Sequence, residues 1–266
     1  MKNLKRALAG IAAVTALVGT FAVSGSAASA DTASQKAKPT VVLVHGAFAD
    51  ASSWTDVTKK LQRRGYQVVA PANPLRGVAS DAAYLKSVLQ SIDGPIVLVG
   101  HSYGGVLISK AAQDDPDVKA LVYIAAFLPD AGETAGELSQ GGKLGPGTIN
   151  TVAYPGGTDV YIKPSAFRDV FAADVSASQA AAMAATQRPI DGSALGTKFE
   201  GAGAWHTIPS WALVASQDNA IPASAERFMA QRAHAKTVEV KASHAVSVSR
   251  PDAVADIVLD AAKSVR

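Results

Sequence analysis

A serine stands among glycines in the run Gly-His-Ser-Tyr-Gly at residues 100–104. A serine hydroxyl becomes a good nucleophile only when a neighbouring base removes its proton. The pattern G-x-S-x-G is typical of a sharp turn from a strand into a helix, where neighbours without a Cβ let the chain pass close by. An apolar run at 95–99 leads directly into this motif, and a helix is predicted at 105–113. This context predicts Ser102 as a nucleophile, and an ordinary glycine–serine turn is the alternative.

A nucleophilic serine needs a base, and the chain has five histidines. The base is expected on a loop after the last strand, because the chain order at such a site is serine, acid, histidine. His244 occupies that place and is the predicted base, with a loop histidine of no catalytic role as the alternative. A structural role is the simpler interpretation of His45 and His101, and a solvent-exposed one of His234, while His206 lies at the end of the insertion at 130–205.

The acid that orients the imidazole is expected directly after the preceding strand. Asp218 follows the predicted strand 211–215 and is the predicted acid. Asp130, just past the predicted strand 118–127, is the competing candidate because it also lies at a strand end. A turn-capping or helix-capping role for Asp218 would produce the same sequence pattern.

A site of this kind also needs two preorganised N–H donors for the oxyanion. The backbone of Tyr103 is one predicted donor, and the turn at 45–48 supplies the other, with Ala47 favoured over Phe48. A plain tight turn is the alternative for this segment. Three aromatic side chains are predicted to bind substrate, although core packing explains each one equally well: Phe48, Phe127 and Trp205. Further candidates of the same kind are Tyr154, Tyr161, Phe167 and Phe171.

Strands and helices alternate along most of the chain. Short β-branched runs followed by amphipathic segments predict an α/β fold with a mainly parallel, doubly wound sheet and helices on both faces. Ligands of such sheets bind beyond the carboxyl ends of the strands, which is where Ser102, Asp218 and His244 fall. The predicted strands are 40–44, 66–70, 95–99, 118–127, 211–215 and 237–240, and the predicted helices are 51–64, 80–91 with Ser80 as N-cap, 105–113, 223–235 and 251–262.

Residues 130–205 interrupt the alternation between two predicted strands. The segment is rich in Gly, Ala, Pro, Ser and Thr and has one predicted helix, at 176–186. Long insertions in compact domains are usually functional or disordered. We expect a partly helical lid, because large apolar side chains such as Met183 need burial, and a disordered excursion is the alternative.

The first thirty residues have the three parts of a secretory signal peptide. A basic start at 2–6 precedes an uncharged, mostly apolar run at 7–23, and small residues at 28–30 suit a cleavage site after Ala30. The apolar run is short and weakly apolar for a stable membrane span, although an uncleaved anchor is the alternative. The pattern predicts a secreted protein, extracellular or periplasmic, with no stable membrane insertion after cleavage.

Composition excludes several other classes. The chain has 266 residues with 25 Lys and Arg, 22 Asp and Glu, and no Cys. Removal of residues 1–30, which contain three basic and no acidic residues, leaves 22 of each sign, so net charge does not favour nucleic-acid binding. The absence of Cys excludes disulfides and thiolate metal sites, and no metal-binding or nucleotide-binding motif occurs. The predicted organisation is a flexible leader at 31–38 and one domain over 39–266.

Four blocks in order resemble the α/β-hydrolase superfamily: 41–48, 100–105, 217–222 and 243–246. The first block together with Trp54 is similar to the branch that holds plant methyl esterases and hydroxynitrile lyases. The resemblance spans about 39–264 and implies a Ser102–Asp218–His244 triad, an acyl-enzyme intermediate and no cofactor. The lid segment matches no motif of a characterised substrate class.

Together these features predict a secreted serine hydrolase that needs no metal. Its expected partner is a small-molecule substrate, a small to medium apolar ester. The same constellation serves hydroxynitrile-type C–C cleavage or perhydrolysis, which differ in the polarity of the pocket. A non-catalytic ligand-binding protein on the same scaffold is the remaining alternative, and the presence of all three triad residues argues against it. The oligomeric state is not predicted.

Overall fold

The computed structural model describes residues 38–265. The predicted signal peptide, residues 1–30, and residues 31–37 of the predicted leader lie outside the described residues. Within the described range, no helix combines the length and the apolar character that a membrane crossing requires.

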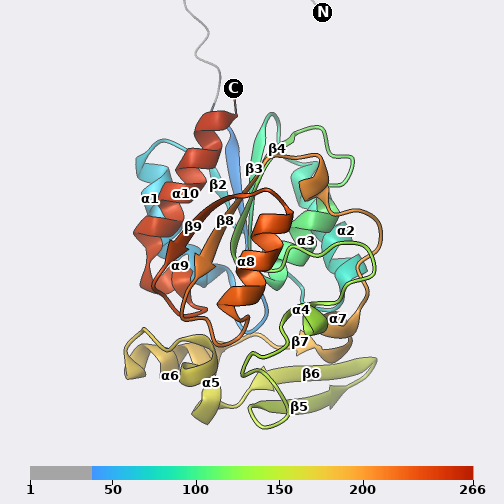
Figure 1. Cartoon of the computed structure of the whole chain (residues 1–266), viewed down its shortest axis with the longest axis vertical. Helices are drawn as coiled ribbons and strands as arrows, with labels where there is room; N and C mark the ends of the chain where they lie inside the picture. Colours follow the sequence, from blue (N-terminus) through green and yellow to red (C-terminus); the bar gives the residue numbers. More distant parts are fainter. Residues whose placement is uncertain (1–37, 266) are drawn as a thin grey trace, which may run out of the picture. The chain divides into compact units, whose positions relative to one another are not determined.

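The domain is organised around a six-stranded sheet in the order β2-β1-β3-β4-β8-β9 (Figure 1). Every neighbouring pair in this sheet is parallel. The predicted parallel sheet is therefore confirmed. The strands are β1 (Thr40–Val44), β2 (Val68–Val69), β3 (Ile96–Ser102), β4 (Val118–Ala126), β8 (Ser210–Ala215) and β9 (Lys236–Val240).

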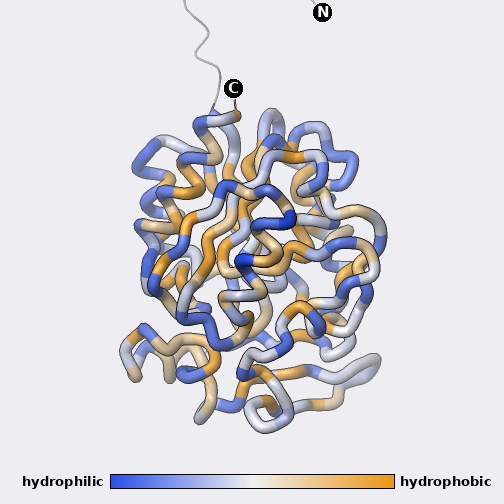
Figure 2. Tube along the Cα trace, viewed as in Figure 1, coloured by the Kyte–Doolittle hydropathy of each residue, from blue (hydrophilic) through white to orange (hydrophobic). Residues whose placement is uncertain are grey.

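Helices cover both faces of the sheet, so both faces of the inner strands are buried. Val42 and Leu98 belong to one apolar cluster with α2, α3 and α8, whereas Leu43 and Val99 belong to a second cluster with α1, α9 and α10. This alternation follows from the two-residue period of a strand, and Figure 2 shows apolar residues along the central strands. The helices are α1 (Thr55–Arg63), α2 (Val78–Leu89), α3 (Tyr103–Ala111), α8 (Ala223–Arg232), α9 (Val246–Ser249) and α10 (Pro251–Ser264).

Two elements differ from their predicted bounds. The strand predicted at 66–70 pairs with β1 only at Val68–Val69, and Pro71, directly after it, has no N–H with which to extend the ladder. The prediction of Ser80 as a helix N-cap is wrong, since α2 begins at Val78 after Gly77. The carboxylate of Asp81 accepts the N–H groups of Arg76 and Gly77, the two residues that precede this helix, and so fixes the start of α2 ahead of Ser80.

The segment between β4 and β8 is partly helical, and it also contains a second, antiparallel sheet of three strands (Figure 1). The helix predicted at 176–186 corresponds to α6, with Ser176 as its N-cap. The three strands were not predicted. The elements are α4 (Ala135–Leu138), β5 (Ile149–Tyr154), β6 (Gly157–Ile162), α5 (Pro164–Phe171), α6 (Ala177–Thr186), β7 (Ile190–Asp191) and α7 (Gly192–Gly196), with 3₁₀ turns η1 (Ala51–Trp54) after β1 and η2 (Ala204–His206) before β8.

Candidate active site

Ser102 stands at the junction between a strand and a helix. It is the last residue of β3, and α3 begins at the next residue. Its backbone φ of 52° lies in the left-handed region, which is unusual for a residue with a side chain and common at functional sites. The sharp reversal turns Ser102 out of the strand at the carboxyl edge of the sheet, where ligands of parallel sheets bind.

Two glycines make this turn possible because backbone passes too close for a Cβ. A Cβ on Gly104 would lie 2.5 Å from the carbonyl oxygen of Val44. A Cβ on Gly46 would lie 2.6 Å from the Cβ of Ser102 itself. The turn after β1 therefore folds directly against the serine, which is the position that an oxyanion-binding turn must occupy.

His244 and Asp218 form a buried pair. Nδ1 of His244 lies 2.5 Å from Oδ2 of Asp218, and the two side chains are 2% and 0% exposed. The other oxygen, Oδ1, accepts the backbone N–H groups of Ala220 and Ile221 at 2.7 and 2.9 Å. Because the carboxylate holds the proton of the neutral imidazole on Nδ1, Nε2 keeps the free lone pair that a general base needs.

Asp130 has a different partner. Its carboxylate binds Nε2 of His206 at 3.1 Å, and its side chain is 33% exposed. Burial alone would raise the pKa of Asp130, but the Ala131 N–H and His206 together lower it below its usual value. In the structure His244 is therefore hydrogen-bonded to Asp218, whereas Asp130 is hydrogen-bonded to His206.

His244, the predicted base, is held from two further sides. The backbone carbonyl of His244 accepts a hydrogen bond from Nε2 of His101 at 2.9 Å, and the two rings lie 4.7 Å apart. Phe171, the last residue of α5, places the edge of its ring against His244 at 4.8 Å. Burial, and then the neighbouring His244, lower the pKa of His101 well below its usual value. His101 is therefore a neutral side chain that supports the loop of the base.

The predicted oxyanion donors lie on two anchored segments. The hydroxyl of Tyr103 donates to Asp81 at 3.1 Å, and burial together with that carboxylate raises the pKa of Tyr103. The backbone N–H of Phe48 donates to the carbonyl oxygen of Arg188 at 3.0 Å, so this donor already has a protein partner. Ala47 precedes it in the same turn and is 3% exposed.

His45 fixes the other end of this turn. Its Nε2 accepts the backbone N–H of Asn73 at 3.0 Å, and its Nδ1 donates to the carbonyl oxygen of Gly46 at 2.9 Å. The two contacts require the tautomer with hydrogen on Nδ1, and burial lowers the pKa of His45. His45 is a structural part of the turn.

The predicted substrate-binding aromatics lie in different surroundings. The N–H of Phe127 donates to the Ser102 carbonyl at 3.3 Å, next to the elbow. Trp205 donates its indole N–H to Pro129 and stacks on His206, and neither contact involves the candidate catalytic residues. Phe48 lines a cavity of about 160 Å³ between the turn after β1 and helix α6, together with Asp50, Ser52, Gln179, Met183 and Val248 among others.

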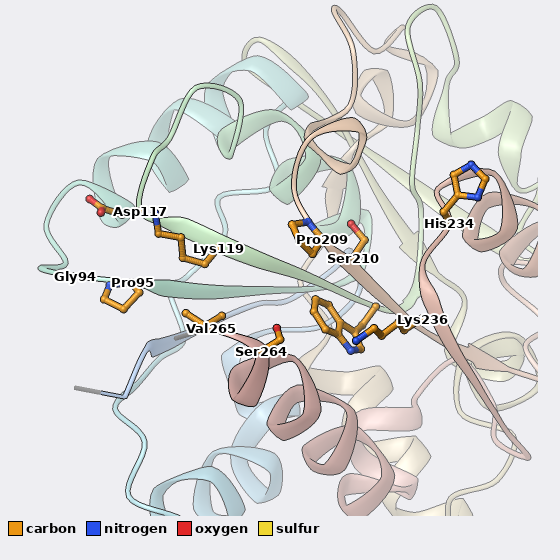
Figure 3. Close-up of a pocket in the computed structure, with 11 residues that line it drawn as sticks. Gly94, Pro95, Asp117, Lys119, Pro209, Ser210, His234, Lys236, Ser264 and Val265 are labelled. Atoms are coloured by element: carbon orange, nitrogen blue, oxygen red, sulfur yellow. The ribbon is translucent and has the colours of Figure 1, made fainter. Parts of the chain in front are cut away.

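A larger groove, of about 750 Å³, lies at the other end of the strands, where they begin (Figure 3). Its lining includes Pro95, Lys119 and Ser210, at the beginnings of β3, β4 and β8. The candidate catalytic residues lie beyond the ends of these strands, so the groove is not their substrate site. Among residues 38–265 there is also no cluster of three potential metal ligands.

Asp81 was missed as a site residue by sequence reasoning. It is fully buried behind the elbow and binds both the start of α2 and the hydroxyl of Tyr103. An acidic residue near the beginning of a helix is usually a solvent-exposed cap or dipole partner, so its type and position carried no signal.

The chain matches the model of the alpha/beta hydrolase family over residues 41–257. It belongs to that family. The resemblance stated from four sequence blocks is therefore confirmed.

The chain is also similar to individual family members. The pyrethroid hydrolase of Sphingobium wenxiniae is 28% identical over 254 residues, which cover 83% of this chain and 86% of that protein. Methylesterase 2 and alpha-hydroxynitrile lyase of Arabidopsis thaliana are 31% and 32% identical over 111 and 103 residues, only 42% and 40% of their own lengths. A crystal structure of a pyrethroid hydrolase from Sphingobium faniae superimposes with a TM-score of 0.71 at 24% identity, covering 85% of this chain and 98% of that one, which shows the common fold.

Proposed function

We propose that this member of the alpha/beta hydrolase family is a secreted serine esterase. The observation that carries the proposal is the buried contact of 2.5 Å between His244 Nδ1 and Asp218 Oδ2, with Ser102 on the elbow at the end of a nearby strand. An imidazole with a carboxylate on one nitrogen and a hydroxyl available to the other is the arrangement that acyl transfer requires.

In the proposed reaction, Ser102 Oγ attacks the carbonyl carbon of the ester while His244 Nε2 takes the hydroxyl proton. The negative charge moves to the carbonyl oxygen, where the N–H groups of Ala47 and Tyr103 stabilise it. Collapse of the tetrahedral intermediate breaks the bond to the alcohol, which leaves with the proton from His244. Water then attacks the acyl-enzyme, with His244 again as base, and releases the acid.

Asp218 acts throughout by its charge and its position. Two backbone N–H groups hold one oxygen, so the other stays aimed at the imidazole. The carboxylate keeps its negative charge and stabilises the imidazolium that forms when Ser102 loses its proton.

The substrate is proposed to be a small to medium apolar ester. The similar proteins named above include enzymes described as a pyrethroid hydrolase and a methylesterase, and both names refer to small-molecule chemistry. The cavity beside Phe48 is small and has Met183 on its α6 wall. Phe48, Ala49, Met183 and Val248 give the lining an apolar part for an acyl or alcohol group, beside polar side chains that include Asp50 and Gln179.

Residues 130–205 are proposed to form a lid over this site. Phe171 contacts His244, and Arg188 binds the backbone of Phe48, so the segment touches both the base and the oxyanion turn. Ser102 and His244 are only 7% and 2% exposed, and a substrate therefore needs the segment to move.

Export is proposed from the basic start, the apolar run and the small residues before position 31. Expression of the full chain in a bacterial host tests this. We expect the protein outside the cytoplasm with residue 31 at its N-terminus. Retention in the cytoplasm, or in the membrane with residues 1–30 attached, would contradict it.

The catalytic proposal is tested with p-nitrophenyl esters and a fluorophosphonate probe. Wild-type protein is expected to hydrolyse short-chain esters and to carry the probe on Ser102, as located by mass spectrometry. Ser102→Ala should lose at least about a thousandfold in kcat/KM with unchanged thermal unfolding. Turnover that survives this substitution, or a probe adduct elsewhere, would overturn the proposal. Cleavage of a cyanohydrin without ester hydrolysis would assign the same residues to C–C cleavage.

A further inference from the structure

A second carboxyl group is buried behind the proposed catalytic acid. Glu226 lies in the first turn of α8 and is 3% exposed. Its Oε2 accepts the backbone N–H of Ala215, the last residue of β8, at 3.0 Å. The carbonyl of Ala215 in turn accepts the N–H of Asp218 at 3.0 Å. Glu226 and Asp218 are therefore bound to opposite sides of the same peptide segment.

The second oxygen of Glu226 has an unusual environment. Oε1 is buried, and no hydrogen-bond donor of the described residues reaches it. The charged groups that act on Glu226 are Asp218, from the turn after β8, and Arg227, which is next to it on the same helix. Arg227 is directed to Glu239, which it binds at 2.7 and 2.8 Å on the surface. The cation is thus engaged elsewhere, and a negatively charged Glu226 would have no buried counter-charge.

Two ionised carboxylates cannot hydrogen-bond to each other because neither carries a proton. The side chains of Glu226 and Asp218 lie within hydrogen-bond reach of each other. A proton on Oε1, which no other donor of the described residues contacts, removes the conflict, since Asp218 then becomes its acceptor. Burial raises the pKa of Glu226 well above its usual value, and the charge of Asp218 raises it further. The physical cause is the cost of placing two like charges in one desolvated site.

Asp218 has an acceptor position left for this proton. A carboxylate offers about four lone-pair sites. The N–H groups of Ala220 and Ile221 occupy two on Oδ1, and His244 Nδ1 occupies one on Oδ2. The fourth lone-pair site, on Oδ2, can accept one further hydrogen bond.

We propose that Glu226 is a positioning residue of the active site: its neutral carboxyl donates a hydrogen bond to Asp218 and holds this residue in line with His244. The effect on catalysis rests on the proposed function, whereas the protonation of Glu226 does not depend on it. The pair of carboxyls carries a single negative charge, and that charge is on Asp218, next to the imidazole that becomes positive. Glu226 acts through Asp218 and does not touch substrate.

Two substitutions of a size similar to Glu226 distinguish the effect of its hydrogen bonds from the effect of its packing. In Glu226→Gln the amide oxygen still accepts from Ala215 and the amide nitrogen still donates to Asp218, so kcat and the pH profile should stay within about twofold of wild type. Glu226→Leu removes both bonds and should lower kcat about tenfold or more with little change in KM, because a hydrogen bond to a charged group is lost. If Gln lowers the apparent pKa of the acidic limb of kcat/KM, it has removed a negative charge near His244, and the proposal is wrong.

Infrared spectroscopy tests the protonation without any need for activity. Wild-type protein at neutral pH should show the C=O stretch of a protonated carboxyl, and Glu226→Gln should lack it. Glu239→Gln is the matched control, because its carboxyl is exposed and paired with Arg227, and the band should persist in this variant. No such band in wild type would overturn the proposal, even if Glu226→Leu fails to fold. A band in a protein that neither hydrolyses esters nor labels at Ser102 would leave the protonated Glu226 in place and refute the proposed function instead.

Discussion

The ring of His101 donates a hydrogen bond to the backbone carbonyl of His244, 143 positions later in the chain. His101 precedes Ser102 on β3, so this bond connects the elbow to the loop of His244, the proposed base. Both rings are buried, and Phe171 packs edge-on against each of them at 6.1 and 4.8 Å. A substitution at 101 therefore acts on the position of His244 relative to Ser102 through the ring and the backbone carbonyl of His244, which His101 contacts.

We expect His101→Phe to lower kcat on a p-nitrophenyl ester about tenfold, because the His244 carbonyl loses its buried donor and the loop shifts. KM should change less than kcat, since His101 is not part of the predicted substrate pocket. Steady-state kinetics measure both. Replacement of the exposed His234 by Gln is the control and should leave both constants unchanged. Wild-type kcat in His101→Phe would show that the bond does not position the base.

The pH dependence of stability follows from two buried histidines. The pKa values of His45 and His101 are lowered in the folded protein, so the unfolded chain binds protons that the native state does not. The contribution of these two histidines to stability should be constant above a pH of about 6.5 and should fall as the pH drops below it, by at most about 1.4 kcal/mol per pH unit for each histidine. The raised pKa of Glu226 contributes a slope of the opposite sign, which wild type and His101→Phe share.

Urea unfolding at several pH values between about 5 and 8 measures this slope. In His101→Phe the slope between about pH 5 and 6.5 should be smaller by the contribution of one histidine. An identical slope in wild type and His101→Phe would mean that His101 binds its proton equally well in the folded and unfolded states.

The sheet and the order of its functional residues could be predicted because buried parallel strands leave a strong signal. β1, β3 and β8 are short runs that are apolar on both faces, and each ends where chemistry was expected. The contact between Asp218 and His244 follows from this order, since both lie on loops beyond neighbouring strands. Sequence alone left Asp130 open because it, too, follows a strand.

Other features left no such signal. β5 is largely solvent-exposed, with Val152 at 53% exposure, and β6 buries only Val160 and Ile162, so the apolar alternation is too short to mark this hairpin. Asp81 and Glu226 are charged residues in the first turns of helices, where exposure is the usual outcome. Their burial depends on partners from distant segments, Tyr103 and Ala215, and no local pattern encodes those contacts.

The two glycines around the nucleophile lead to a further prediction. Gly104→Ala should destabilise the protein by about 1–3 kcal/mol or more, since its Cβ would overlap the backbone of Val44 in the core. Gly46→Ala should reduce activity more than stability, because its Cβ would press on Ser102 and displace the hydroxyl.

Denaturation and ester hydrolysis, measured on the same preparations, separate these effects. Gly145→Ala is the control, because nothing lies within 4 Å of the added Cβ and φ is not in the left-handed region. It should match wild type in both measurements. Full activity in Gly46→Ala would show that the turn after β1 can move away from the serine, and Ala47 would then be a poor choice of oxyanion donor.

The contact between Phe171 and His244 connects the proposed lid to catalysis. The Phe171 ring is 2% exposed, and its backbone carbonyl accepts the N–H of Ala245, so α5 is attached to the base loop at two points. Phe171→Ala should cost about 3–5 kcal/mol of stability by opening a cavity between lid and core.

Phe171→Leu fills most of that volume and should cost less, but it loses the aromatic ring that restrains His244. We expect Phe171→Leu to fold with near-normal stability and to lose about three- to tenfold in kcat/KM on short esters. Val152→Ala, at an exposed position of the same segment, should leave stability and turnover unchanged. Equal kcat/KM for Phe171→Leu and wild type would show that the aromatic contact contributes packing alone.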